Sequence, residues 1–117
     1  MILAAVDDLM FSSKIRTTAQ QLGLPVTFAR SLEQIVSEAR SGAPTLAIFD
    51  LNSVRCQPLA AIVALKADPE LARIPTVGFV SHVQTDLIEA ARGTGLDEIL
   101  PRSAFTAQLA SILERGR

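Results

Sequence analysis

Short apolar runs, rich in β-branched or aromatic residues, recur five times along this 117-residue chain. Such runs are typical of strands buried on both faces of a sheet. Segments with apolar residues at helical spacing lie between the runs and after the last one, which makes strand and helix alternate strictly. This alternation requires parallel strands, right-handed crossovers and helices on both faces, and therefore predicts an α/β doubly wound three-layer sandwich. The predicted strands are Ile2–Val6, Val26–Ala29, Leu46–Phe49, Thr76–Val80 and Glu98–Leu100.

The ends of the predicted helices carry the expected start and stop residues. Gly23, Gly42 and Gly93 follow three of the helical segments. Glycine commonly ends a helix because it adopts the left-handed conformation without a steric penalty. Ser31 stands before the second helical segment with Gln34 three residues later, which is the sequence of a capping box. These signals support the division into five strands, each followed by a helix.

The composition fits one domain over residues 1–117 and excludes several functional classes. Hydrophobic residues make up 49% of the chain, enough for a substantial core. The net charge is −1 and the five Phe are unaccompanied by Trp or Tyr, so we expect no direct nucleic-acid partner. Cys56 is the single cysteine and cannot form an internal disulfide, and no uncharged apolar stretch approaches the roughly 18 residues of a membrane span. We therefore expect a cytoplasmic domain without an anchoring segment.

Polar side chains gather where the predicted strands end. Asp7 and Asp8 follow the first strand, Asp50 the third, Ser81 the fourth and Arg102 the fifth. Ligands of open parallel sheets bind beyond the carboxyl ends of the strands. Three carboxylates at about 5 Å and an effective dielectric of about 20 repel one another by roughly 3 kcal/mol per pair, so something must neutralise them. Arg102 supplies one charge, and an oxygen-rich cluster of this kind suits Mg²⁺.

These residues suggest phosphoryl chemistry. A carboxylate screened by a metal can attack phosphorus and form an acyl phosphate, while a hydroxyl and a cation stabilise the equatorial oxygens. Asp50 takes the first role in this hypothesis, and Ser81 and Arg102 take the second.

The whole chain resembles the receiver domain of response regulators in two-component signalling, including the chemotaxis regulators. That family has an acidic pair after strand one, a lone aspartate after strand three, Thr or Ser after strand four and Lys after strand five. The resemblance implies a flavodoxin-like sheet of order 2-1-3-4-5 and a phosphate-accepting Asp50. It further implies that Asp8 and Asp50 bind Mg²⁺ directly, that the backbone carbonyl of Asn52 adds a third ligand and that Asp7 acts through water.

The resemblance also implies a signalling role and partners. The domain would accept phosphate from a histidine kinase or phosphotransfer protein and would catalyse only its own phosphorylation and dephosphorylation. It would then contact a downstream protein, or a second copy of itself, through the face made by the fourth helix, the fifth strand and the fifth helix.

Several positions depart from the family and keep a second function open. Arg102 replaces an almost invariable Lys, and it follows Pro101, whereas the family has the proline after the Lys. Ile99 stands where the family often has a switching Tyr or Phe, and the loop after Asp50 is atypical. These departures favour the alternative of a pseudo-receiver that acts, without phosphorylation, as an interaction or dimerisation module. A third option, a flavodoxin-like cofactor binder, is opposed by the acidic pair where a phosphate-binding loop would be needed.

Some of these residues also have simpler interpretations. Asp7 and Asp8 would suit the positive end of a helix dipole, and Asp50 would suit a turn. Ser81 is either functional or a helix N-cap, whereas Ser103 is expected to be an N-cap.

The remaining two candidates are assigned no chemistry. His82 is the only histidine and is expected at an exposed turn without a role, and Cys56 is expected to be an incidental loop thiol.

Overall fold

Five parallel strands form a single sheet in the order β2-β1-β3-β4-β5. The computed structural model describes residues 1–81 and 84–117. The strands are β1 (Ile2–Ala5), β2 (Val26–Phe28), β3 (Leu46–Asp50), β4 (Thr76–Val80) and β5 (Glu98–Pro101). The predicted fold class is therefore confirmed, and each strand begins and ends within one residue of its predicted range.

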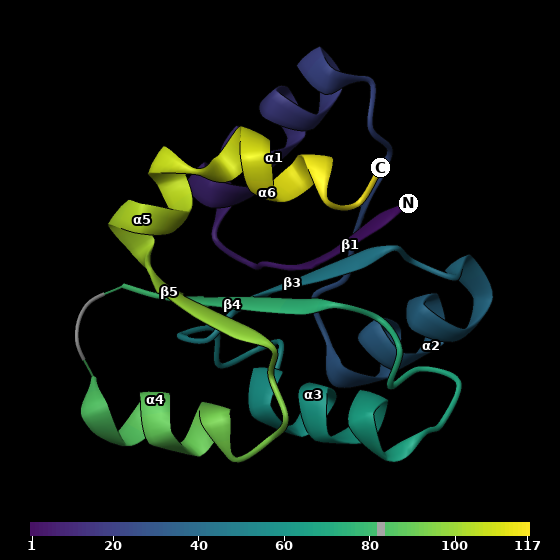
Figure 1. The fold of residues 1–117 in the computed structure, drawn as a ribbon, viewed down its shortest axis with the longest axis vertical. Helices are drawn as coiled ribbons and strands as arrows, with labels where there is room; N and C mark the ends of the chain where they lie inside the picture. Colours follow the sequence, from purple (N-terminus) through teal and green to yellow (C-terminus); the bar gives the residue numbers. More distant parts are fainter. Residues whose placement is uncertain (82–83) are drawn as a thin grey trace.

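Helices cover both faces of the sheet, as Figure 1 shows, with α2, α3 and α4 on one side and α1, α5 and α6 on the other. The described helices are α1 (Leu9–Leu22), α2 (Leu32–Gly42), α3 (Pro58–Ala67), α4 (Thr85–Arg92), α5 (Arg102–Ala107) and α6 (Leu109–Glu114). The sequence predicted one helix after the last strand, and the structure divides it at Gln108, whose φ of −106° and ψ of 12° are not helical. No helix in the described part of the chain is long and apolar enough to cross a membrane.

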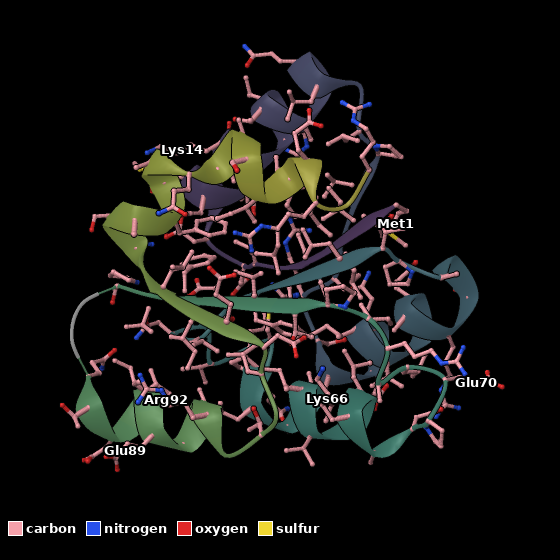
Figure 2. The ribbon with its side chains drawn as sticks, in the orientation of Figure 1. Met1, Lys14, Lys66, Glu70, Glu89 and Arg92 are labelled. Atoms are coloured by element: carbon pink, nitrogen blue, oxygen red, sulfur yellow. The ribbon has the colours of Figure 1, made fainter. Side chains whose placement is uncertain are left out.

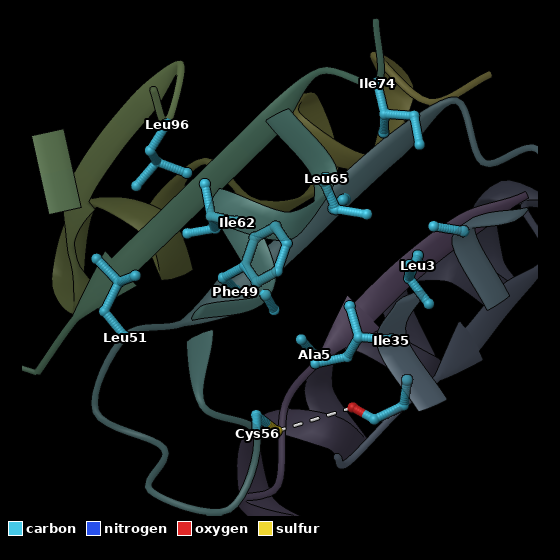
Figure 3. Close-up of a cluster of buried hydrophobic side chains, with 14 of the residues drawn as sticks. Leu3, Ala5, Ile35, Phe49, Leu51, Cys56, Ile62, Leu65, Ile74 and Leu96 are labelled. Carbon is cyan, nitrogen blue, oxygen red and sulfur yellow. Dashed lines mark hydrogen bonds between the residues drawn. The ribbon is translucent and has the colours of Figure 1, made fainter. Parts of the chain in front are cut away.

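Two hydrophobic clusters fill the spaces between the sheet and its helices. Successive residues of the central strand β3 point into opposite clusters, so that Phe49 packs towards α3 while Ile48 packs towards α1 and α6. Figure 3 shows Phe49 among Ile62, Leu65 and other side chains of the first cluster. Every residue of β3 is buried. Since full burial of a large aliphatic or aromatic side chain contributes about 1.5–3 kcal/mol, these clusters hold the central strands firmly.

Helix ends bear out some of the sequence signals, but α2 includes Gly42 and is capped by the left-handed Ala43, and Gly93 after α4 has a right-handed φ of −66°. Gly23 takes the left-handed conformation after α1, with φ of 70°. The Ser31 hydroxyl accepts the Gln34 N–H at 3.1 Å at the start of α2. The N-cap prediction for Ser103 is wrong, because α5 begins at Arg102 and Ser103 lies inside its first turn. Proline at the end of β5 already sets the chain direction there, which leaves serine no capping position.

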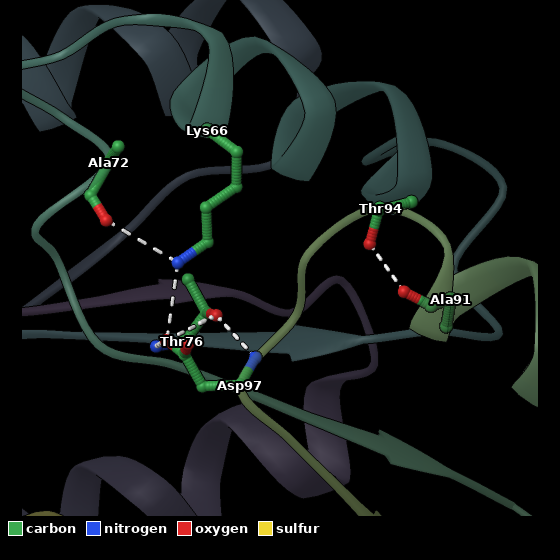
Figure 4. Close-up of polar contacts among 6 residues, drawn as sticks. All are labelled: Lys66, Ala72, Thr76, Ala91, Thr94 and Asp97. Atoms are coloured by element: carbon green, nitrogen blue, oxygen red, sulfur yellow. Dashed lines mark hydrogen bonds and ion pairs between the residues drawn. The ribbon is translucent and has the colours of Figure 1, made fainter.

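A polar network around Asp97 holds the amino edge of the sheet, the edge at which the strands begin (Figure 4). One oxygen of the Asp97 carboxylate accepts the Thr76 N–H at 2.8 Å, the Thr76 hydroxyl at 3.0 Å and the Lys66 ammonium at 3.2 Å. The Asp97 N–H in turn donates to the Thr76 hydroxyl. Burial opposes ionisation of Asp97, but the hydrogen bonds from Thr76 and Lys66 outweigh it and lower the pKa of this carboxyl. The network fixes the start of β5 against β4 and α3.

We predict that Asp97→Ala lowers the free energy of unfolding by about 1–3 kcal/mol, because it leaves the buried Thr76 without its acceptor. Urea denaturation followed by circular dichroism measures this. Asp97 has a lowered pKa in the folded state, so its contribution is present above the ordinary Asp pKa and is lost as the pH falls through the lowered value. The control is Glu89→Ala on the outer side of α4 (Figure 2). Equal stability of the Asp97→Ala and control proteins at pH 7 would contradict this account.

Candidate functional site

Asp7, Asp8 and Asp50 come together at the carboxyl edge of the sheet. β1 and β3 are neighbours in a register that pairs Ala5 with Phe49, so the residues that follow these two strands leave the sheet side by side. Asp50 is the last residue of β3, where the buried strand places it directly, and it is only 6% exposed. The three carboxylates therefore lie at the same edge of the sheet, close enough for the charges of Asp7 and Asp8 to act on Asp50.

The buried carboxyl group of Asp50 lies in a strongly electrostatic setting. Burial is the largest influence and raises its pKa, and the negative charges of Asp8 and Asp7 act in the same direction. The Asn52 N–H, which donates to Oδ1 at 3.0 Å, and the positive charge of Arg102 act in the opposite direction. The net pKa of Asp50 is above its ordinary value. A carboxyl group in this state binds protons or cations more readily than an exposed one.

Asp8 uses both of its carboxylate oxygens. Oδ1 accepts the Phe11 N–H at 3.0 Å, so Asp8 is the N-cap of α1, as the simpler interpretation proposed. Oδ2 lies 3.3 Å from Nη2 of Arg102. The hydrogen bond from Phe11 is the largest influence on Asp8 and, with further help from Arg102, lowers the pKa of this carboxyl despite some desolvation. The pKa of Asp8 is therefore lowered, whereas the pKa of the neighbouring Asp50 is raised.

Arg102 is held by an aromatic ring as well as by a carboxylate. It is the first residue of α5, directly after Pro101. Its guanidinium carbon lies 4.2 Å from the centroid of the Phe11 ring. Nε of Arg102 is buried and has no hydrogen-bond acceptor among the described residues. In the described part of the chain, the ion-pair partner of Arg102 is Asp8 and not Asp50.

Arg55 was not anticipated as a member of this edge. Its Nη1 lies 3.5 Å from Oδ1 of Asp7, and Arg55 belongs to the atypical loop between β3 and α3. Both side chains are well exposed to solvent, so the pair contributes less than about 1 kcal/mol. In the sequence, Arg55 is only a cation five residues after Asp50. Its pairing with Asp7 depends on the conformation of the loop, which the sequence does not reveal.

Asn52 joins the loop after β3 to the segment after β4. Its Oδ1 accepts the backbone N–H of Ser81 at 2.8 Å, and its Nδ2 donates to Oε1 of Gln84 at 2.6 Å. The side chain of Asn52 thus connects two segments, a role that the sequence did not predict. The predicted role concerned its backbone carbonyl, as a ligand of Mg²⁺. Gln84, the N-cap residue of α4, was not identified from the sequence. His82 lies outside the described residues.

Cys56 lies in the loop between β3 and α3, as expected, and its side chain is buried in the core. It is 0% exposed, and its Sγ lies 3.8 Å from the carbonyl oxygen of Ala29 (Figure 3). Burial raises the pKa of this thiol above its ordinary value. A buried thiol with a raised pKa is a poor nucleophile.

The donor set at this edge suits Mg²⁺, although the side chains are engaged with one another. Among the described residues, no group of three or more His, Cys, Asp or Glu side chains is already arranged as a metal site. Mg²⁺ prefers carboxylate oxygen, needs only one or two carboxylates and retains several waters. Asp8 and Asp50, whose charges act on each other, provide that chemistry.

Comparison with known proteins identifies the fold. No protein-family model matches the sequence, and no curated protein matches it. Among solved structures, the magnesium-bound receiver domain of sensor histidine kinase PA1611 from Pseudomonas aeruginosa gives a TM-score of 0.84 at 21% identity, covering 98% of this chain and 94% of that one. Chemotaxis protein CheY4 from Vibrio cholerae gives 0.83 at 16% identity, covering 99% and 97%.

A third structure, the phosphorylated cyanobacterial phytochrome response regulator RcpA, gives a TM-score of 0.79 at 22% identity, covering 97% of this chain and 87% of that one. The similarity to all three extends over nearly the whole chain, and the sheet order 2-1-3-4-5 is that of a flavodoxin-like fold. The chain therefore has the fold of a response regulator receiver domain.

We predict that Asp50→Asn stabilises the metal-free protein at pH 7, by an amount on the order of 1 kcal/mol. The substitution removes a buried negative charge and keeps an oxygen that can accept the Asn52 N–H. Because the folded-state pKa of Asp50 is raised, its ionisation costs stability, and the cost appears as the pH rises from the ordinary Asp pKa through the raised value. Thermal unfolding in EDTA at pH 7 and pH 3 measures this. A mutant that is less stable than wild type at pH 7 would contradict the electrostatic account.

Proposed function

We propose that this chain is a receiver domain of two-component signalling in which Asp50 accepts a phosphoryl group from a histidine kinase or phosphotransfer protein. The observation that carries the proposal is the nearly buried Asp50 carboxylate at the end of β3, beside two more carboxylates and a cation. Its setting in a receiver fold supports the same function. The domain is then a signalling module whose only catalysis is directed at itself.

The proposed chemistry follows from the surroundings of Asp50. Since Oδ1 accepts the Asn52 N–H, attack on phosphorus is assigned to Oδ2. A new bond forms between Oδ2 and phosphorus, the bond between phosphorus and the donor nitrogen breaks, and that nitrogen keeps the electron pair and takes up a proton. Ser81 follows β4 and Arg102 follows β5, and both are proposed to stabilise the transferred phosphoryl oxygens.

Mg²⁺ is the proposed cofactor. Asp8 and Asp50 would bind it directly, the backbone carbonyl of Asn52 would add a third ligand and Asp7 would act through water. When bound, the ion neutralises the negative charge of the phosphoryl group and of the carboxylates. The receiver domain from Pseudomonas aeruginosa, which was solved with magnesium in its active site cleft, supports this assignment.

The proposed output surface is the face made by α4, β5 and α5, which would contact a downstream protein or a second copy of the domain. Ile99 in β5 is half-buried and has no aromatic ring to rotate. The side chain of Asn52, which bonds both Ser81 and Gln84, offers a different connection from the phosphate-accepting loop to the start of α4.

The pseudo-receiver remains the second candidate because of one observation. The cation that should assist phosphate is paired with Asp8 and lies over Phe11. If that arrangement is permanent, the domain acts without phosphorylation through an interaction surface.

We predict that wild-type protein acquires a labile phosphoryl adduct when incubated with Mg²⁺ and acetyl phosphate or phosphoramidate. Intact mass spectrometry measures the adduct, which should disappear after brief exposure to hydroxylamine because acyl phosphates react with it. Asp50→Asn should give no adduct. Asp86→Asn, an exposed acid in the first turn of α4, is the matched control and should behave like wild type.

Wild-type protein that is folded, supplied with Mg²⁺ and still unmodified would overturn the phosphorylation proposal in favour of the pseudo-receiver. An adduct of equal yield in Asp50→Asn would place the modification elsewhere and would also reject Asp50 as the acceptor.

A further inference from the structure

The cation of this site is bound more firmly than an ordinary surface arginine. Three observations concern Arg102: an ion pair to Oδ2 of Asp8 at 3.3 Å, a ring contact to Phe11 at 4.2 Å and a buried Nε. A guanidinium that lies over an aromatic face gains a cation–π attraction, and its planar shape allows stacking that an ammonium cannot make. The guanidinium is therefore contacted from two sides, while the side chains of Arg102 and Asp8 remain 36% and 40% exposed.

The ring beneath Arg102 is itself rigid. Phe11 is 6% exposed and stacks on Phe79 of β4 with ring centroids 5.0 Å apart. Phe79 stacks on Phe105 of α5 at 4.4 Å. Three aromatic rings from α1, β4 and α5 thus form a platform that supports the guanidinium next to Asp8. Aromatic clusters of this kind add stability beyond their buried area, so the platform resists displacement.

Asp8 is fully engaged as a result. One oxygen caps α1 by accepting the Phe11 N–H, and the other is paired with Arg102. Phe11 therefore acts on both sides, since its backbone holds one oxygen of Asp8 and its ring holds the arginine that pairs with the other oxygen. A metal ion that binds Asp8 must share an oxygen that already has a partner, and it does so against the repulsion of the nearby positive charge of Arg102.

We propose that Arg102 is a built-in counter-ion that competes with Mg²⁺ for Asp8, with Phe11 holding it in place. This inference rests on the proposed metal site. In the metal-free protein, Arg102 thereby controls whether Asp8 is available to the metal. Release of Arg102 from Asp8 frees the same guanidinium to reach a phosphoryl group on Asp50, so metal binding and the movement of the cation are coupled.

The arginine side chain, and not merely a positive charge, is responsible for this competition. Lysine at the same position keeps the charge but loses the planar group over the ring. Arg102→Lys should therefore bind Mg²⁺ about fivefold more tightly than wild type, the change that corresponds to a cation–π contact at a partly exposed site. Phe11→Leu keeps Arg102 and removes the ring, and should change the affinity in the same direction.

The test is a Mg²⁺ titration of metal-free protein followed by the backbone amide NMR signals near Asp8 and Asp50. NMR is chosen because the chain has no Trp or Tyr for fluorescence. Arg115→Lys is the matched control, since Arg115 pairs with Glu98 away from this edge, and it should keep the wild-type affinity. Wild-type affinity in Arg102→Lys, or weaker binding, would overturn the proposal.

A second readout does not depend on mutation. The Nε–H of Arg102 is buried, so its NMR signal should exchange slowly with water in metal-free protein. Saturation with Mg²⁺ should shift this signal and speed its exchange. An Nε–H signal unchanged by saturating Mg²⁺ would show that Arg102 stays in place and would refute the competition.

These results are separable from the fate of the proposed function. Phosphorylation of Asp50 together with equal Mg²⁺ affinity in wild type and Arg102→Lys would leave the receiver function intact and reject the competition. A Mg²⁺-dependent Arg102 signal in a protein that never accepts phosphate would support the competition and reject the function.

Discussion

The negative charge of Asp50 is the constraint around which the carboxyl edge is arranged. β3 is buried on both faces, and its last residue carries a carboxylate into a poorly solvated position. Two further carboxylates follow the adjacent strand, and their charges raise the pKa of Asp50. Three contacts offset this negative charge: the Asn52 N–H donates to Asp50, the guanidinium of Arg102 pairs with Asp8, and Arg55 pairs with Asp7. An edge with this excess of negative charge favours a cation, which is the property that a metal-dependent phosphoryl acceptor requires.

The sandwich controls where each neutralising group can lie. The order β2-β1-β3-β4-β5 places the ends of β1, β3 and β4 in a row, and α5 begins directly after β5. At the amino edge, the Asp97 network fixes β5 against β4 and therefore fixes the starting point of α5. The rings of Phe11, Phe79 and Phe105 stack on one another, and the guanidinium of Arg102 lies over the Phe11 ring. The aromatic packing beside Asp50, where Phe79 is its register partner, thus helps to place the cation next to Asp8.

The fold followed from the sequence because hydrophobic period and helix punctuation are local signals that this chain carries clearly. Placement of Asp7, Asp8 and Asp50 at one edge also followed, since parallel topology brings the ends of neighbouring strands together. The sequence did not predict which groups each of these side chains contacts. Arg102 reaches Asp8 because of a ring position that no periodicity reveals, and the side-chain bonds of Asn52 depend on the path of an irregular loop.

Other differences between prediction and structure have the same origin. The helix after β5 breaks at Gln108 without a glycine or proline to announce it. Cys56 lies in the loop between β3 and α3, as expected, but this loop folds inward and buries the thiol beside Ala29. Both outcomes depend on tertiary packing, which overrides the local preferences of single residues.

The central claim, that Asp50 and its neighbours form a metal-dependent phosphoryl acceptor, is tested most directly with beryllium fluoride, a non-transferable analogue of the bound phosphoryl group. Fluorine NMR of the wild-type protein with beryllium, fluoride and Mg²⁺ reports a protein-bound species without requiring turnover. The account predicts bound fluorine resonances that need Mg²⁺ and are absent from Asp50→Asn. Folded wild-type protein that shows only free beryllium fluoride at saturating Mg²⁺ would contradict it.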